Sequence, residues 1–139
     1  MERFELPTPT STTVRGCPPN PDLPRDRPGY HLHSNKHARA LIESCGRDNV
    51  KLQFDLYHCQ ISEGDLFRSL ERDIDLIAHV QIASVPERAE PSLGEIAYAN
   101  VLGHLDALGY RGHVGCEYSP TSDTLSSLSW AAPYLRAES

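Results

Sequence analysis

Three oxygen-bearing side chains stand near the ends of three successive apolar segments of this sequence. They are Asp55, Gln81 and Glu117, and the histidines His58 and His79 lie within three residues of two of them. Carboxylate and amide oxygens are the ligands that a hard divalent cation such as Mg²⁺ or Mn²⁺ prefers. A single acidic residue in such a place is equally well explained by pairing with an arginine. On spacing alone, the structural and the functional interpretation therefore carry equal weight.

The segments that position these residues have the pattern of alternating strands and helices. We expect strands at 50–57, 76–83 and 114–118, and helices at 34–45, 66–74, 98–108 and 124–135. Strands and helices that alternate at this spacing form parallel βαβ units. The predicted fold class is α/β with about three parallel strands, either as a small open sheet or as part of a barrel. In α/β barrels the carboxyl ends of the strands carry the functional residues.

The N-terminal segment, residues 1–29, differs from the rest of the chain. It holds seven of the 11 prolines and shows no hydrophobic period. Such a segment buries too little apolar surface to offset the entropy lost on ordering, so we expect it to be disordered. An extended arm packed on the body is the alternative. Residues 30–139 form the predicted folded body.

Composition excludes several classes of protein. The net charge is −6, and the sequence lacks the basic stripe that nucleic-acid binding requires. It also lacks an apolar run of about 18 residues, so no membrane span is expected. The four cysteines form no C-x-x-C pair, and the first residues do not resemble a secretory signal. A cytoplasmic location is the expected one.

The residues around the three candidate ligands resemble a known family. The segments FDLYHCQ (54–60), HVQIA (79–83) and GCEY (115–118) are similar to three consecutive motifs of the hydroxypyruvate isomerase family, within the xylose-isomerase-like TIM barrel superfamily. The connecting segments PERAEP (86–91) and GEI (94–96) and the ending from Trp130 to Tyr134 fit the same family. The resemblance implies the C-terminal portion of a (β/α)8 barrel, containing its sixth to eighth strands. A complete barrel normally needs about 250 residues.

The resemblance also implies roles for individual residues. Asp55, Gln81 and Glu117 match three metal-coordinating positions, and Glu117 matches a glutamate that exchanges a proton with substrate carbon. His58 and Arg88 match positions that contact substrate oxygens, and a planar guanidinium suits a substrate carboxylate. We expect His79 to support the ligands from behind through hydrogen bonds. The implied cofactor is a divalent metal ion, Mg²⁺ or Mn²⁺, which would polarise the substrate carbonyl and stabilise an enediolate.

The activity implied by the resemblance is an aldose–ketose type isomerisation. The substrate is a small oxo-acid, with hydroxypyruvate converted to 2-hydroxy-3-oxopropanoate, or a 2-oxo-tetronate as a variant. The family's fourth ligand and second glutamate belong on a preceding strand, whereas the matching stretch here, PPNPDLP (18–24), has no glutamate. The alternatives are therefore a catalytically inactive part of a barrel or a module that binds an acidic sugar. We also expect the unpaired edges of a partial sheet to favour a homodimer.

Overall fold

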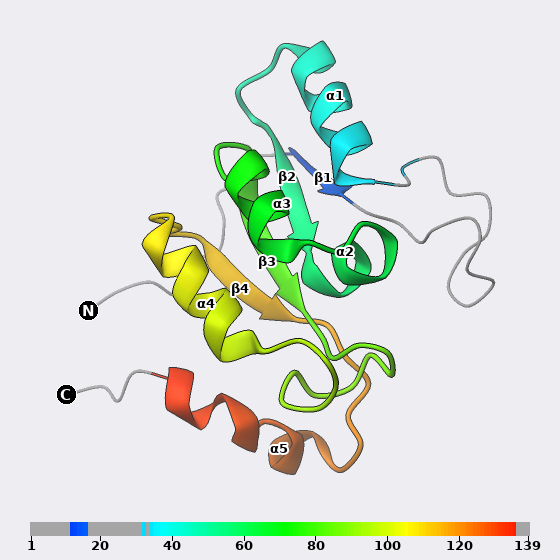
Figure 1. Cartoon of the computed structure of the whole chain (residues 1–139), viewed down its shortest axis with the longest axis vertical. Helices are drawn as coiled ribbons and strands as arrows, with labels where there is room; N and C mark the ends of the chain where they lie inside the picture. Colours follow the sequence, from blue (N-terminus) through cyan, green and yellow to red (C-terminus); the bar gives the residue numbers. More distant parts are fainter. Residues whose placement is uncertain (1–11, 17–31, 33, 136–139) are drawn as a thin grey trace.

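A parallel four-stranded sheet forms the centre of the chain in the computed structural model, which describes residues 12–16, 32 and 34–135 (Figure 1). The strands are β1 (Thr12–Gly16), β2 (Val50–Asp55), β3 (Ile77–Ile82) and β4 (His113–Cys116), and they lie side by side in that order. All three strand pairs are parallel. The predicted α/β class, with β2, β3 and β4 separated by helices, is confirmed.

Helices lie between the described strands and after the last of them. They are α1 (Asn35–Cys45), α2 (Leu56–Ser62), α3 (Leu66–Asp73), α4 (Tyr98–Ala107) and α5 (Thr124–Ser127), followed by the 3₁₀ helix η1 (Ser129–Tyr134). In Figure 1, α1, α3 and α4 all lie in front of the sheet, as right-handed crossovers between parallel strands require. Among the described residues, no helix combines the length and apolar character needed to cross a membrane.

Helix α1 shows how closely the local sequence specifies an element. The hydroxyl oxygen of Ser34 accepts a hydrogen bond from the backbone N–H of His37 at 3.1 Å, which satisfies one of the free donors of the first turn. Gly46 ends the helix in the left-handed conformation, with φ of 56°. Glycine adopts this conformation without a steric penalty. Both ends lie where the sequence predicted them.

Strand β1 was not predicted from the sequence. It lies within the N-terminal segment that we expected to be disordered, and it pairs with β2 from Thr12↔Val50 to Gly16↔Phe54. The pairing partner lies far along the sequence, and a local pattern therefore carries no signal for it. The remainder of the predicted segment 1–29 lies outside the described residues.

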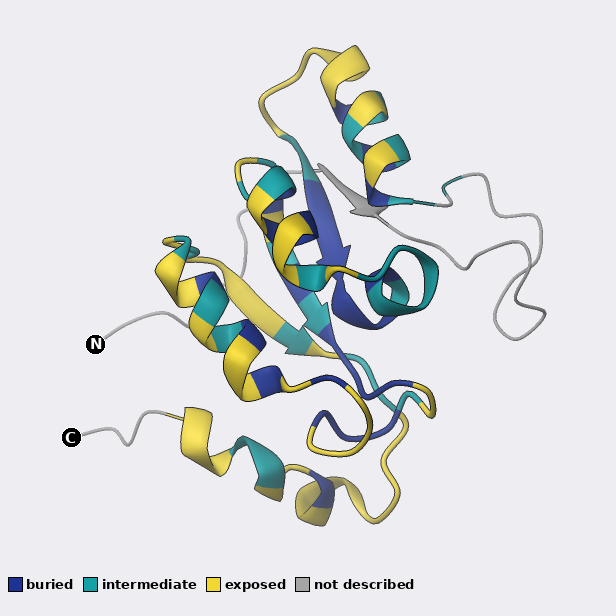
Figure 2. Ribbon diagram, viewed as in Figure 1, coloured by how far each residue is buried: buried dark blue, intermediate teal, exposed yellow. Residues whose placement is uncertain are grey.

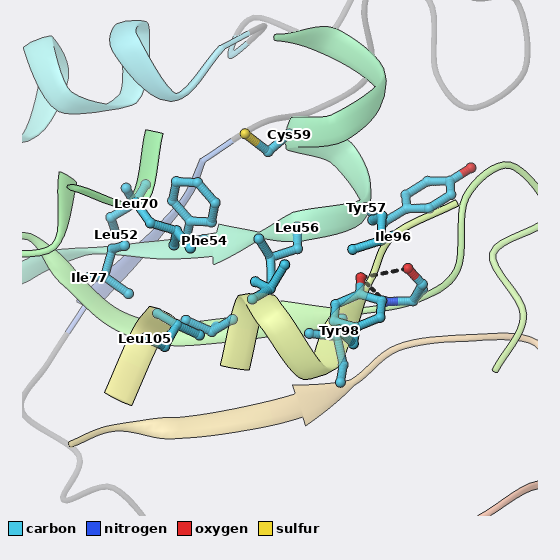
Figure 3. Packing of buried hydrophobic residues seen from close by; sticks show 14 of the residues in the cluster. Leu52, Phe54, Leu56, Tyr57, Cys59, Leu70, Ile77, Ile96, Tyr98 and Leu105 are labelled. Atoms are coloured by element: carbon cyan, nitrogen blue, oxygen red, sulfur yellow. Dashed lines mark hydrogen bonds between the residues drawn. The ribbon is translucent and has the colours of Figure 1, made fainter. Parts of the chain in front are cut away.

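The core lies between the sheet and the helices. Leu52 and Phe54 of β2 and Val80 of β3 are fully buried, and they pack with Leu70 of α3 and Leu105 of α4 (Figure 3). Burying each such side chain stabilises the fold by about 1.5–3 kcal/mol. Burial is uneven across the sheet, because β2 is largely buried whereas β4 is mostly exposed (Figure 2). The residues that alternate with these apolar ones belong to the opposite face, where the candidate site lies.

Candidate functional site

The three candidate ligands meet at the carboxyl edge of the sheet because of the strand register. Asp55 of β2 lies beside Gln81 of β3, and Gln81 lies beside Gly115 of β4. Glu117 stands two residues beyond Gly115 and therefore belongs to the same face. Its backbone N–H still donates to the carbonyl oxygen of Ile82 at 3.1 Å, which keeps this segment against β3. The register thus brings together side chains that the sequence distributes over more than sixty positions.

Asp55 ends β2 and begins α2. Its Oδ1 accepts hydrogen bonds from the backbone N–H groups of Tyr57 at 2.9 Å and His58 at 3.3 Å, so the carboxylate caps the helix. Its Oδ2 lies 3.8 Å from Nε2 of His58. Burial raises the pKa of the Asp55 carboxyl above its usual value, although the charges of His58 and Arg88 act to lower the pKa. The site therefore holds a carboxylate whose ionised form the fold does not favour.

Two further polar side chains of β2 and β3 lie next to the candidate ligands. Gln53 donates a hydrogen bond from Nε2 to Oε1 of Gln81, and Gln53 is itself buried. His79 lies beside Gln53 in the register, two residues before Gln81, and its ring extends over Gly115 of β4. The Gln53 amide thus contacts a candidate ligand directly, and the His79 imidazole belongs to the same face of the sheet.

Arg88 links the two carboxylates of the site. Its NH2 nitrogen lies 3.1 Å from Oε1 of Glu117 and 4.0 Å from Oδ2 of Asp55. The guanidinium carbon also lies 5.0 Å from the centre of the Tyr57 ring, within the range of a cation–π interaction. The side chain of Glu117 is 42% exposed and that of Arg88 is 29% exposed, although Oε2 of Glu117 is itself buried.

The loop after β3 is tied to the loop after β4. Arg88 has a left-handed backbone with φ of 52°, and its N–H donates to the carbonyl oxygen of Ser84 at 2.9 Å. Its own carbonyl oxygen accepts from the N–H of Ser119 at 2.8 Å. Oε1 of the buried Glu90 accepts hydrogen bonds from the backbone N–H and the hydroxyl of Thr121, at 2.9 and 3.0 Å. These bonds position Arg88 opposite Glu117.

The donor chemistry of the site fits part of a divalent cation site. Asp55, Gln81 and Glu117 offer two carboxylates and an amide oxygen at adjacent strand ends, which suits Mg²⁺ or Mn²⁺. Within the described part of the chain, no three His, Cys, Asp or Glu side chains converge into a metal-binding group. Strand β1, which lies beside β2, has the sequence TTVRG and contributes no carboxylate.

The structure places every residue of the predicted site at this edge of the sheet. Asp55, Gln81 and Glu117 occupy strand ends, while His58, Arg88 and His79 lie around them. Their chemical roles remain predictions. Sequence reasoning assigned no role to Gln53, Ser84, Glu90 or Gly115, which hold or adjoin these side chains. The strand periodicity signals Gln53, because it precedes Asp55 by two residues, whereas Glu90 and Gly115 depend on contacts across the fold.

Comparison with known proteins identifies relatives of the chain. Residues 24–134 match a family model described as "Xylose isomerase-like TIM barrel". The chain is 50% identical over 111 residues to a 2-oxo-tetronate isomerase of Cupriavidus necator, covering 80% of this chain and 43% of the relative. It is 42% identical over 109 residues to the hydroxypyruvate isomerase of Escherichia coli, covering 78% of this chain and 42% of the relative. The chain thus spans less than half the length of these curated relatives.

Comparison with solved structures also finds similar folds. A crystal structure described as an AP endonuclease, family 2, from Brucella melitensis superimposes with a TM-score of 0.82 and 44% sequence identity. The match covers 89% of this chain and 46% of that one. A 3-keto-D-glucoside 4-epimerase from Escherichia coli superimposes with a TM-score of 0.74 at 23% identity, covering 88% of this chain and 46% of the epimerase. At that identity the similarity shows a shared fold alone.

Proposed function

The chain belongs to the xylose isomerase-like TIM barrel family, and from this premise we propose that it takes part in the isomerisation of a small oxo-acid. The proposed reaction interconverts hydroxypyruvate and 2-hydroxy-3-oxopropanoate. The 2-oxo-tetronate isomerase relative, at 50% identity, supports a 2-oxo-tetronate as the alternative substrate. The observation that carries the proposal is the convergence of Asp55 and Glu117 on the single Arg88 guanidinium at the carboxyl edge of the sheet.

Glu117 is the proposed acid–base group. Its side chain is 42% exposed, and its backbone N–H donates to the carbonyl oxygen of Ile82 in β3, which holds the residue at the carboxyl edge of the sheet. A carboxylate in this place can take the proton from the carbon next to the substrate carbonyl and return it to the neighbouring carbon. Together with transfer of the hydroxyl proton to the former carbonyl oxygen, this step exchanges the positions of the carbonyl and hydroxyl groups, which is the proposed isomerisation.

The remaining site residues are proposed to hold the substrate and a cation. Asp55, Gln81 and Glu117 would bind Mg²⁺ or Mn²⁺, which polarises a carbonyl and favours loss of the adjacent proton. Arg88 has the planar donors that match a carboxylate, and it lies in a loop fixed to Ser119. His58 lies next to Asp55 and can donate to a substrate oxygen.

The test is an isomerisation assay of the full chain with hydroxypyruvate and with a 2-oxo-tetronate, in Mn²⁺ and in EDTA. We expect turnover that requires the metal, and Glu117→Gln should reduce it by about 10²-fold or more, as loss of a general acid–base group does. The same change at the exposed Glu43 of α1 is the matched control and should retain turnover. Circular dichroism checks that both variants are folded. Undiminished activity in Glu117→Gln would contradict the role of this residue.

Binding without turnover is the second candidate function. The described residues bring two carboxylates to the site, and the proposed reaction uses Asp55 to bind the cation, so Glu117 is left to serve both carbons of the substrate. A module of this kind would still use Arg88 to recognise the carboxylate of an acidic sugar. Titration calorimetry with hydroxypyruvate separates the two functions, because heat of binding with no product formed supports the module.

A further inference from the structure

Each of the three candidate metal ligands already has a partner within the chain. Oδ1 of Asp55 caps α2, and Oε1 of Gln81 accepts a hydrogen bond from Gln53. Oε1 of Glu117 lies 3.1 Å from the guanidinium of Arg88. One oxygen of each candidate ligand is therefore already engaged by a protein group in this structure.

The guanidinium of Arg88 occupies the region where a cation would bind the two carboxylates. One guanidinium nitrogen approaches Oε1 of Glu117 at 3.1 Å and Oδ2 of Asp55 at 4.0 Å, so it lies between the carboxylates. An ion such as Mg²⁺ binds carboxylate oxygens at about 2.0–2.1 Å and would need the same space between them. Two positive groups in that space would also repel each other, because the site is partly buried and poorly screened.

The position of Arg88 is built into the fold. Its backbone has a φ of 52°, which is unfavourable for a residue with a side chain and persists only where surrounding contacts enforce it. Those contacts are hydrogen bonds to Ser84 on one side and from Ser119 on the other. The Tyr57 ring, 5.0 Å from the guanidinium carbon, provides a further favourable contact. Backbone strain of this kind, next to two carboxylates, is typical of a functional loop.

We infer that Arg88 is an internal cation that competes with the divalent metal for Asp55 and Glu117. In the metal-free chain it neutralises the two carboxylates, and metal binding displaces its side chain from them. The released guanidinium is then available for the carboxylate of an incoming oxo-acid. This inference rests on the proposed metal site, and it assigns Arg88 a second task beyond substrate binding.

The test measures Mn²⁺ affinity of the full chain by the electron paramagnetic resonance signal of free Mn²⁺. Arg88→Gln removes the competing charge and should bind Mn²⁺ roughly two- to fivefold more tightly, the range of a partly exposed ion pair. Arg88→Lys keeps a positive charge and should remain near the wild-type affinity. Arg111→Gln, at an exposed position outside the site, is the matched control for the change in net charge. Circular dichroism of each variant checks the fold.

The outcomes separate this inference from the proposed function. Tighter binding in Arg88→Gln than in Arg111→Gln supports the competition. If the wild type binds Mn²⁺ and Arg88→Gln binds it equally or more weakly, the competition is refuted and the metal site stands. If neither chain binds Mn²⁺, both the metal site and the competition are refuted. In a fourth outcome Arg88→Gln binds Mn²⁺, the wild type does not, and adding Asp55→Asn to Arg88→Gln abolishes the binding. This result supports the competition, with Arg88 preventing metal binding in the unaltered chain.

Discussion

The imidazole of His79 lies over Gly115, so closely that a Cβ atom on Gly115 would be 2.8 Å from Nε2 of the histidine. Cβ atoms do not normally approach another heavy atom that closely. The His79 ring therefore fits here because residue 115 is a glycine. The two residues belong to neighbouring strands, and Gln81, the candidate ligand, lies directly beside Gly115. The glycine therefore has a packing role at the site.

We predict that Gly115→Ala disturbs His79. The added methyl group forces the imidazole away, and overpacking of this kind costs about 1–3 kcal/mol in the free energy of unfolding. Because the contact atom is at the far end of a side chain that can move, we expect a value near the lower end. Urea denaturation followed by circular dichroism measures the change.

The double variant identifies the cause. In a His79→Ala background the methyl group on residue 115 has room, and Gly115→Ala should cost clearly less than in the unaltered chain. Equal costs in the two backgrounds would show that the backbone of β4, rather than His79, is responsible.

The second prediction concerns Asp55 and the pH dependence of stability. Since burial raises the pKa of its carboxyl, the folded chain holds this proton more readily than the unfolded chain does. The associated stability is present below the ordinary pKa of aspartate and is lost as the pH rises through the raised value. Asp55→Asn, which carries no charge and can still cap α2, should melt on the order of a few degrees higher than the unaltered chain near pH 7.5.

The pH profile tests this explanation. The advantage of Asp55→Asn should shrink as the pH is lowered, because the wild-type carboxyl then takes up its proton. Thermal melting by circular dichroism across the acid range measures both chains. A variant that is less stable than the wild type at neutral pH would show that the contacts with Arg88 and His58 outweigh burial.

The third prediction concerns the outer edge of β4. In the described sheet β4 pairs only with β3, and Val114 in its middle is 37% exposed. Unpaired backbone groups and exposed apolar side chains on an edge strand favour association with another strand. We therefore expect a homodimer, and Val114→Lys should shift it toward the monomer.

Size-exclusion chromatography with light scattering, over a range of protein concentrations, measures this equilibrium. Leu125→Lys on α5, at a side chain that is 82% exposed, adds the same charge away from the edge and should leave the dimer intact. A monomeric wild-type chain at all concentrations would contradict the prediction.

Much of the fold follows from patterns that are local in the sequence. Ser34 and Gly46 set the ends of α1 because the cap hydrogen bond and the left-handed turn depend on adjacent residues. The apolar run of β3 and the polar residues at strand ends followed from periodicity in the same way. The predicted strand 50–57 was too long by two residues. Asp55 caps α2, and Leu56 and Tyr57 begin that helix instead of continuing β2.

The sequence by itself thus determined the alternation of strands and helices and the side chains at the carboxyl edge. Only the tertiary structure decided how these side chains pair. Arg88 reaches Asp55 and Glu117 through loops whose course depends on hydrogen bonds to distant segments, such as that between Glu90 and Thr121. Strand β1 likewise exists through its ladder with β2. Such contacts join residues far apart along the chain, and their geometry arises only when the sheet has formed.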